Sequence, residues 1–496
     1  MNIAEYFLKK GYLVNSGFNV EGAYFFDDEN VFSEELVLEN IGEYKFDNIV
    51  VKEVEEKKIE VIENKEDKIV LDVDNNEKRN IKIVRCYRED SRKREVGDFV
   101  TLMKYKFEYL KNILLNREEL QDTLSINKVL ERKDREYVSI IGIVKEKREN
   151  KTGSFTLTLE DVTGEIRVLF KKDSEFFDDV KDIVLDEVIG VTGSKGDDIV
   201  FVNNFYIPDI PIYNELKKYD EEEYVVFTSD VHVGSNVFFE DNFKKFISWL
   251  NLEYGNEKQK EIAKKVKHVF IAGDLVEGIG IYPGQEKDLK TQDIYEQYEE
   301  FAKYVNSIRK DITVVLIAGN HDAVRLAEPQ PVVDNKTAPS LYKNENVIFT
   351  TNPSVVNICA KDGFPGFNIL LYHGYSFVYF SEEVESIRKN GRLDRCDLIM
   401  KFLLQRRHLA PSHGSNLYIP DSNNDNLIID MIPDFFVSGH IHKVSATNYR
   451  GITLLNCGCW IDQTEYQEKQ GMIPDPNRIM VANLQTRDIK ILNFGD

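Results

Sequence analysis

Five short segments between residues 230 and 442 place acidic, amide or imidazole side chains directly after runs of apolar residues. The segments are Asp230-Val231-His232, Gly273-Asp274, Gly319-Asn320-His321-Asp322, His373-Gly374 and Gly439-His440-Ile441-His442, and they hold five of the eight histidines. The preceding runs, of which Val225-Val226-Phe227 and Val314-Val315-Leu316-Ile317 are examples, are typical of short buried strands. Side chains at the carboxyl ends of neighbouring strands meet at one edge of a sheet. The pattern therefore predicts an α/β domain with a single polar site.

Such a site suits divalent metal ions. Apart from His321, the segments offer seven ligands: Asp230, His232, Asp274, Asn320, His373, His440 and His442. Mixed nitrogen and oxygen ligands favour Mn²⁺, Fe²⁺ or Zn²⁺, whereas an all-oxygen set favours Mg²⁺ or Ca²⁺. One ion needs only three or four of these ligands, so the set indicates two ions, which would lower the pKa of a water shared between them. His321 is then placed to act on a leaving-group oxygen as an acid or hydrogen-bond donor.

In the first half of the chain, the spacing of apolar residues changes from one region to the next. We expect a small, mainly helical region over residues 1–70. A charged linker and a helix should follow over 71–132, because apolar residues recur at helical spacing from Phe99 to Leu114. Over residues 133–212 the period changes to two, and five short strands with a helix after the third predict an OB-fold barrel. The α/β domain should occupy residues 222–496.

Composition limits how the chain could meet a partner. Its formal net charge is −22, whereas a protein that holds nucleic acid by bulk electrostatics is normally basic. Local basic patches, metal ions or a partner subunit would have to bind any DNA. No apolar run reaches the roughly 18 residues that span a bilayer. Five scattered cysteines without a disulfide framework fit a reducing cytoplasm. Cys457-Gly458-Cys459 lacks a second pair for zinc, so we expect both cysteines to be buried.

The residues around the segments resemble those of the calcineurin-like metallophosphoesterase superfamily, and within it the small subunit of archaeal family-D DNA polymerases. The resemblance is carried by the runs Gly273-Asp274-Leu275-Val276-Glu277-Gly278-Ile279-Gly280-Ile281-Tyr282-Pro283-Gly284-Gln285, Gly319-Asn320-His321-Asp322-Ala323-Val324-Arg325-Leu326-Ala327-Glu328-Pro329-Gln330-Pro331, Arg406-Arg407-His408-Leu409-Ala410-Pro411 and Gln463-Thr464-Glu465-Tyr466-Gln467. It extends from about residue 97 to the C-terminus.

This resemblance implies a four-layer α/β/β/α metallophosphoesterase domain that follows the OB-fold in the sequence. It implies a 3′–5′ exonuclease that proofreads for a larger polymerase subunit and acts on mismatched or single-stranded DNA 3′ ends in the nucleoid-associated cytoplasm. The sliding clamp is a further expected partner. Mn²⁺ is the first candidate metal, with Mg²⁺, Fe²⁺ or Zn²⁺ as alternatives. By the same resemblance, one ion would be held by Asp230, His232, Asp274 and His442, the other by Asp274, Asn320, His373 and His440, and His321 would be the catalytic histidine.

Two other functions stay open at this stage. The chain could be a non-catalytic assembly subunit of the polymerase, or a stand-alone metallophosphatase or phosphodiesterase. The intact ligand set speaks against the first, and the upstream barrel against the second.

Weaker candidates lie outside the ligand set. Arg406, Arg407, His408 and His413 form a basic cluster that could hold a DNA backbone, although a solvated helix end fits them equally well. Aromatic residues on the barrel strands could stack on bases, but their alternation favours core packing. His268 is expected to be packed rather than a ligand. The barrel could bind single strands or dock a partner, and its acidity favours docking.

Overall fold

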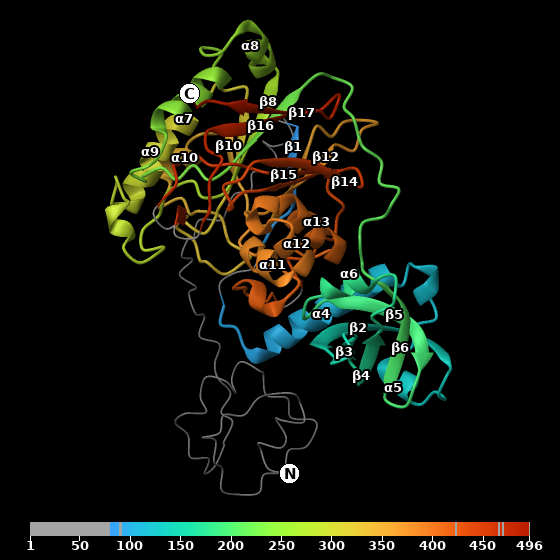
Figure 1. The fold of residues 1–496 in the computed structure, drawn as a ribbon. Helices are drawn as coiled ribbons and strands as arrows, with labels where there is room; N and C mark the ends of the chain where they lie inside the picture. The colour runs from blue at the N-terminus through green and yellow to red at the C-terminus, as the bar shows by residue number, and fades with distance from the viewer. Residues whose placement is uncertain (1–79, 89–91, 422–423, 465–466, 469–470, 496) are drawn as a thin grey trace, which may run out of the picture. The chain divides into compact units, whose positions relative to one another are not determined.

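The computed structural model describes residues 80–495, apart from 89–91, 422–423, 465–466 and 469–470. The predicted helical region over residues 1–70 lies outside the described residues. Residues Leu71–Asp496 form one compact unit, and Figure 1 shows its elements in chain order.

A closed barrel of five strands forms first, in the order β2-β3-β4-β6-β5. Its elements are β2 (Tyr137–Glu149), β3 (Phe155–Glu160), β4 (Glu165–Phe170), α6 (Phe177–Lys181), β5 (Val188–Lys195) and β6 (Ile199–Tyr206). Strand β3 alternates buried and partly buried positions throughout its length, whereas β2 and β5 contain long buried runs. The barrel closes because β4 pairs in parallel with β6. The predicted OB-fold, with its helix after the third strand, is confirmed.

Helix α4 (Val96–Leu114) packs on the outside of this barrel. Phe107, Leu110 and Leu114 form a buried cluster with Ile141 and Val188 of the barrel strands, which confirms the helix predicted from its apolar spacing. Short helices η1 (Glu118–Leu120) and α5 (Ile126–Leu130) lead from α4 into the barrel.

Two six-stranded sheets build the rest of the unit. One has the order β10-β9-β8-β7-β16-β17, with β7 (Tyr224–Thr228), β8 (Val266–Ala272), β9 (Thr313–Ile317), β10 (Val347–Phe349), β16 (Arg478–Asn483) and β17 (Ile489–Asn493). The other has the order β1-β11-β12-β13-β15-β14, with β1 (Ile81–Arg85), β11 (Ser354–Ile358), β12 (Phe367–Leu371), β13 (Phe435–Ser438), β14 (Ser445–Tyr449) and β15 (Ile452–Asn456).

The sheets stack face to face, and helices cover their outer faces. Phe227 and Phe270 of the first sheet meet Phe435 of the second in one buried core. A second core joins the first sheet to its helices, and a third joins the other sheet to its own. The first set of helices is α7 (Glu240–Leu250), α8 (Glu257–Lys264), η2 (Gln285–Lys287), α9 (Ile294–Asn306) and α10 (Pro339–Tyr342). The second is α11 (Phe377–Glu383), α12 (Glu385–Lys389), η3 (Arg392–Arg395), α13 (Cys396–Arg406) and η4 (His413–Ser415). The predicted four-layer α/β/β/α fold is confirmed.

Strand β1 differs from the sequence prediction, which placed residues 81–85 in a charged linker. It pairs antiparallel with β11 and forms the edge of the second sheet. Arg85 at its end is tied down by Asp430, 2.8 Å away, and by the carbonyl of Asp425. The alternation of Ile81 and Ile83 was the available signal, but a five-residue strand among charged residues is easily missed.

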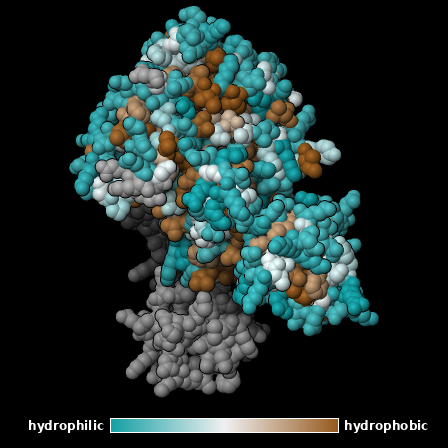
Figure 2. Space-filling model, viewed as in Figure 1, coloured by the Kyte–Doolittle hydropathy of each residue, from teal (hydrophilic) through white to brown (hydrophobic). Residues whose placement is uncertain are grey.

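The surface is mostly hydrophilic, with scattered apolar patches, on the face shown in Figure 2. Among the described residues, no helix is long and apolar enough to cross a membrane.

Candidate metal centre

All five segments follow strands that lie in the middle of the two sheets. Strands β7, β8 and β9 are neighbours and parallel in the first sheet, and β12 and β13 are neighbours and parallel in the second. Their carboxyl ends lie at the same edge of the stacked sheets, where the segments begin. The sequence predicted convergence at strand ends but did not indicate that two sheets share the site.

The backbone at the site is unusual, because five of the seven predicted ligands have positive φ angles. They are Asp230 (53°), His232 (54°), Asp274 (51°), His440 (68°) and His442 (59°). Residues with a Cβ seldom adopt this left-handed conformation, and such outliers cluster at functional sites. The surrounding fold therefore holds these side chains in directions that a relaxed loop would not favour.

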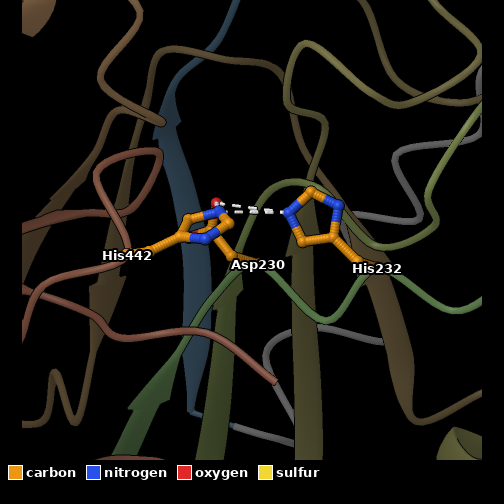
Figure 3. A group of neighbouring side chains, drawn as sticks. All are labelled: Asp230, His232 and His442. Carbon is orange, nitrogen blue, oxygen red and sulfur yellow. Dashed lines mark hydrogen bonds and ion pairs between the residues drawn. The ribbon is translucent and has the colours of Figure 1, made fainter. Parts of the chain in front are cut away.

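Asp230, His232 and His442 form one group, hereafter the Asp230 group. Figure 3 shows the two imidazoles pointing toward the Asp230 carboxylate from opposite sides. The Nε2 atoms of His232 and His442 are 3.2 Å apart, and Nε2 of His442 is 3.3 Å from Oδ1 of Asp230. Behind it, the amide of Gln467 lies 2.9 Å from Nδ1 of His442. Three buried ligand atoms thus surround one small space.

The second group, hereafter the Asp274 group, consists of Asp274, Asn320, His373 and His440. Nε2 of His373 lies 3.3 Å from Oδ2 of Asp274 and 3.0 Å from Oδ1 of Asn320. Its Nδ1 lies 2.8 Å from the carbonyl of Ala272 and donates a hydrogen bond to it, which leaves Nε2 for a ligand role. Asp274 also approaches Nε2 of His232 at 3.7 Å, so it stands between the two groups.

His321 lies next to both groups, and one of its ring nitrogens forms a third candidate set with His232 and Asp274, whose ligand atoms all lie within 4.8 Å of one another. Its backbone N–H donates to Oδ1 of Asp274 at 2.8 Å, and its ring packs edge-on to that of His232 with centroids 4.6 Å apart. Its Nδ1 lies 2.7 Å from the carbonyl of Glu277 and donates to it, which leaves Nε2 for other partners. The ring is partly open to solvent, with its side chain 15% exposed. A substrate could therefore reach it.

The electrostatics fit a cation at each group. Burial alone would raise the pKa of Asp274, but the imidazoles of His373 and His321 outweigh it and hold that pKa well below its usual range. Burial alone would lower the pKa of His373, yet Asp274 and Asp230 raise it to about 9. Burial and the neighbouring His373 lower the pKa of His440 to about 3. Buried carboxylates that draw protons onto adjacent imidazoles would equally draw a metal ion.

Glu277 is a site residue that the sequence analysis passed over. It is buried, its Oε2 lies 3.0 Å from Nδ1 of His232, and its carbonyl holds His321. Gln285 donates to its side chain at 3.2 Å. A carboxylate behind a ligand histidine fixes the tautomer and raises the basicity of the ring. The available signal was its position three residues after Asp274.

The predicted DNA-contacting cluster needs correction at three of its four residues. Arg406 is buried, and its Nε donates to Glu187 of the barrel at 3.2 Å. Arg407 is buried and donates to the carbonyls of Ile429 and Asp430. His408 is buried against Asp425, 2.9 Å away. Side chains so engaged are not available to a DNA backbone.

The remaining candidates lie outside the two groups. His413 is exposed, with Nδ1 2.6 Å from the hydroxyl of Tyr418, and its contact with DNA stays a prediction. Cys457, Cys459 and His268 are buried, as expected. Of the barrel aromatics, Phe155 and Phe170 are core residues, Phe205 packs against that core and Tyr206 against the cluster under α4. Phe201 is 40% exposed, so the expectation of core packing holds for most of them.

Comparison with known proteins agrees with the fold. Residues 224–444 match the family model of calcineurin-like phosphoesterases, and residues 138–197 match an OB-fold nucleic-acid-binding domain. A DNA polymerase II small subunit of Methanothermobacter thermautotrophicus is 39% identical over 81% of this chain and 80% of its own length. The Pyrococcus furiosus protein of the same name is 36% identical over 81% of this chain and 64% of its own length. A solved structure described as a novel archaeal phosphodiesterase aligns with 54% of this chain at 13% identity and a TM-score of 0.26, a likeness too weak to add to the assignment. The chain belongs to the family of DNA polymerase II small subunits, with a calcineurin-like phosphoesterase domain behind an OB-fold domain.

Proposed function

We propose that this chain is a metal-dependent 3′–5′ exonuclease that removes mismatched nucleotides from DNA ends for a larger polymerase subunit. The observation that carries the proposal is the convergence of all seven predicted ligands in two adjacent groups, in which Asn320 and His440 are partly buried and the others are buried. The names of the relatives support a polymerase context and a larger partner. A sliding clamp as a further partner stays a prediction.

In this proposal, different residues of the protein bind the ions, donate a proton and support the ligands. The Asp230 and Asp274 groups would each hold one divalent ion, Mn²⁺ being the first candidate, with Asp274 reaching both. When bound, two such ions acidify a water and neutralise the charge of the phosphate under attack. His321 is held by Glu277 with Nε2 available, so it can place a proton on the departing oxygen. Oε2 of Glu277 lies 3.0 Å from Nδ1 of His232, outside hydrogen-bond geometry, so its charge would favour a proton on that nitrogen.

A nuclease assay on the purified full chain tests the proposal. With Mn²⁺ and a primer labelled at its 5′ end and mismatched at its 3′ end, we expect shortening from the 3′ end. His321→Ala should slow it by about 10²–10⁴-fold, the usual contribution of a general acid, whereas Tyr295→Ala, at an exposed residue of α9, should not change the rate of shortening.

The same assay can reject the proposal. Absence of 3′ shortening by the wild type, alone and with its large subunit, would overturn it. Hydrolysis of p-nitrophenyl phosphate without action on DNA would favour a stand-alone phosphatase. Tight binding to the large subunit without any turnover would favour a non-catalytic assembly role.

A further inference from the structure

Two buried amide side chains lie behind the Asp274 group and have no part in the chemistry described so far. Gln330 belongs to the run Ala327-Glu328-Pro329-Gln330-Pro331, and Asn352 stands just before β11. Their exposed fractions are 2% and 0%. Their backbones bond to each other in both directions, at 2.6 and 3.1 Å. A buried amide without a hydrogen-bond partner costs free energy. The partners of these two side chains therefore show what holds them in place.

The side chains form one continuous line of hydrogen bonds. The backbone N–H of His373 donates to Oδ1 of Asn352 at 2.9 Å. Nδ2 of Asn352 donates to Oε1 of Gln330 at 2.7 Å. Nε2 of Gln330 donates to the carbonyl of Gly319 at 3.1 Å. The line therefore begins at one ligand residue, His373, and ends beside another, Asn320.

The direction of the line is fixed at both ends. A backbone N–H can only donate and a backbone carbonyl can only accept, so each amide has one orientation that satisfies its neighbours. Flipping either amide would set two donors or two acceptors against each other. The bonds also cross between the sheets, because Gly319 follows β9 of the first and His373 follows β12 of the second. No backbone ladder joins β9 to β12.

We propose that Gln330 and Asn352 are positioning residues that hold the Asn320 and His373 loops in register and so set the affinity of the Asp274 group for its ion. The inference rests on the proposed two-ion function and deepens it. It predicts an asymmetric effect. Breaking the line loosens two of the four ligands of the Asp274 group, while the Asp230 group, which receives no bond from either amide, keeps its ion. Outer partners of metal ligands typically govern about 10–100-fold in affinity.

Calorimetric titration of the metal-free full chain with Mn²⁺ tests this. Asn352→Leu removes the acceptor of His373 and the link to Gln330. Asn357→Leu is its matched control, because Asn357 is also buried and its Nδ2 donates to another amide, Asn368, at 2.7 Å, but at the far end of β11. We expect two tight Mn²⁺ sites in the wild type and the control. In Asn352→Leu we expect one tight site and one weakened about 10–100-fold.

A milder variant guards against misfolding. Gln330→Met is similar in length and cuts the link to Gly319 while leaving Asn352 to bond His373, so we expect a smaller loss at the same site. Wild-type affinity at both sites in both variants, or an equal loss in Asn357→Leu, would overturn the inference. If the wild type itself failed to bind two Mn²⁺ ions, the two-ion function would fall instead, so the two failures are distinguishable.

Discussion

The two ligand groups and the segment Arg406–His408 look alike in the sequence, since both are short runs of charged or imidazole side chains. In the structure both are buried, but their partners differ. The basic side chains meet acceptors of the protein itself, such as Glu187 and Asp425. The ligand atoms mainly meet one another, with imidazole and carboxylate crowded around spaces that suit a cation. Burial alone therefore does not mark a functional site. A metal site is indicated where buried carboxylates and imidazoles crowd together, so that a bound cation would balance their charge.

The largest effect should come from Asp274→Ala, which removes the carboxylate that reaches both groups. We expect nuclease turnover to fall by at least about 10³-fold, because two-ion stabilisation is worth several kcal/mol. Single-turnover digestion of a 3′-mismatched primer measures this. Asp425→Ala is the matched control, since it also removes a buried carboxylate from a histidine, and turnover per folded molecule should be kept. Equal losses in the two variants would erase the contrast between the regions.

Arg406→Ala should lower stability and leave nuclease turnover unchanged. It leaves Glu187, only 2% exposed, with its charge uncompensated, so we expect the free energy of unfolding to fall by about 3–5 kcal/mol. Urea denaturation measures the loss, and turnover per folded molecule should not change. Should Arg406→Ala weaken DNA binding without affecting unfolding, the original prediction of a DNA contact would stand.

The free energy of unfolding should also depend on pH, by an amount similar to the Arg406→Ala loss, because of Glu328. Its buried carboxyl accepts a hydrogen bond from the Tyr372 hydroxyl at 3.0 Å. Burial raises its pKa to about 7. A carboxyl whose pKa is raised on folding keeps its proton in the folded state while the unfolded chain loses it. Stability should therefore fall as pH rises from about 4.5 to about 7, by up to about 3 kcal/mol. Denaturation across this range measures it. Glu328→Gln should flatten the dependence, and a wild-type slope in that variant would contradict the assignment.

The smallest effect should come from Glu277→Ala, because Glu277 acts behind His232 and not on substrate. We expect a loss of about 10–100-fold in Mn²⁺ affinity or turnover, with part of it recovered in Glu277→Gln, which keeps an acceptor for Nδ1. Mn²⁺ titration followed by the digestion assay measures both. No change in either quantity would remove Glu277 from the site.

The sequence predicted the features that depend on local periodicity. The barrel, helix α4 and the strands before each segment follow from alternation and helical spacing, and the ligand residues follow from scarce histidines placed after apolar runs. Strand β1 was missed because five residues carry little periodic signal, and its place is set by pairing with distant β11. Arg406 was misjudged for the same physical reason: its partner, Glu187, lies in the barrel and far away in sequence. The roles proposed for Glu277 and Gln330 rest on contacts that no local sequence pattern encodes.

We propose that the five segments build two adjacent ion sites. Anomalous diffraction from crystals of the full chain grown with Mn²⁺, measured at the manganese absorption edge, tests it most directly. We predict two peaks, one among Asp230, His232 and His442 and one among Asp274, Asn320, His373 and His440, with Asp274 reaching both. A single peak, no peak, or manganese bound only elsewhere on the chain would contradict the account.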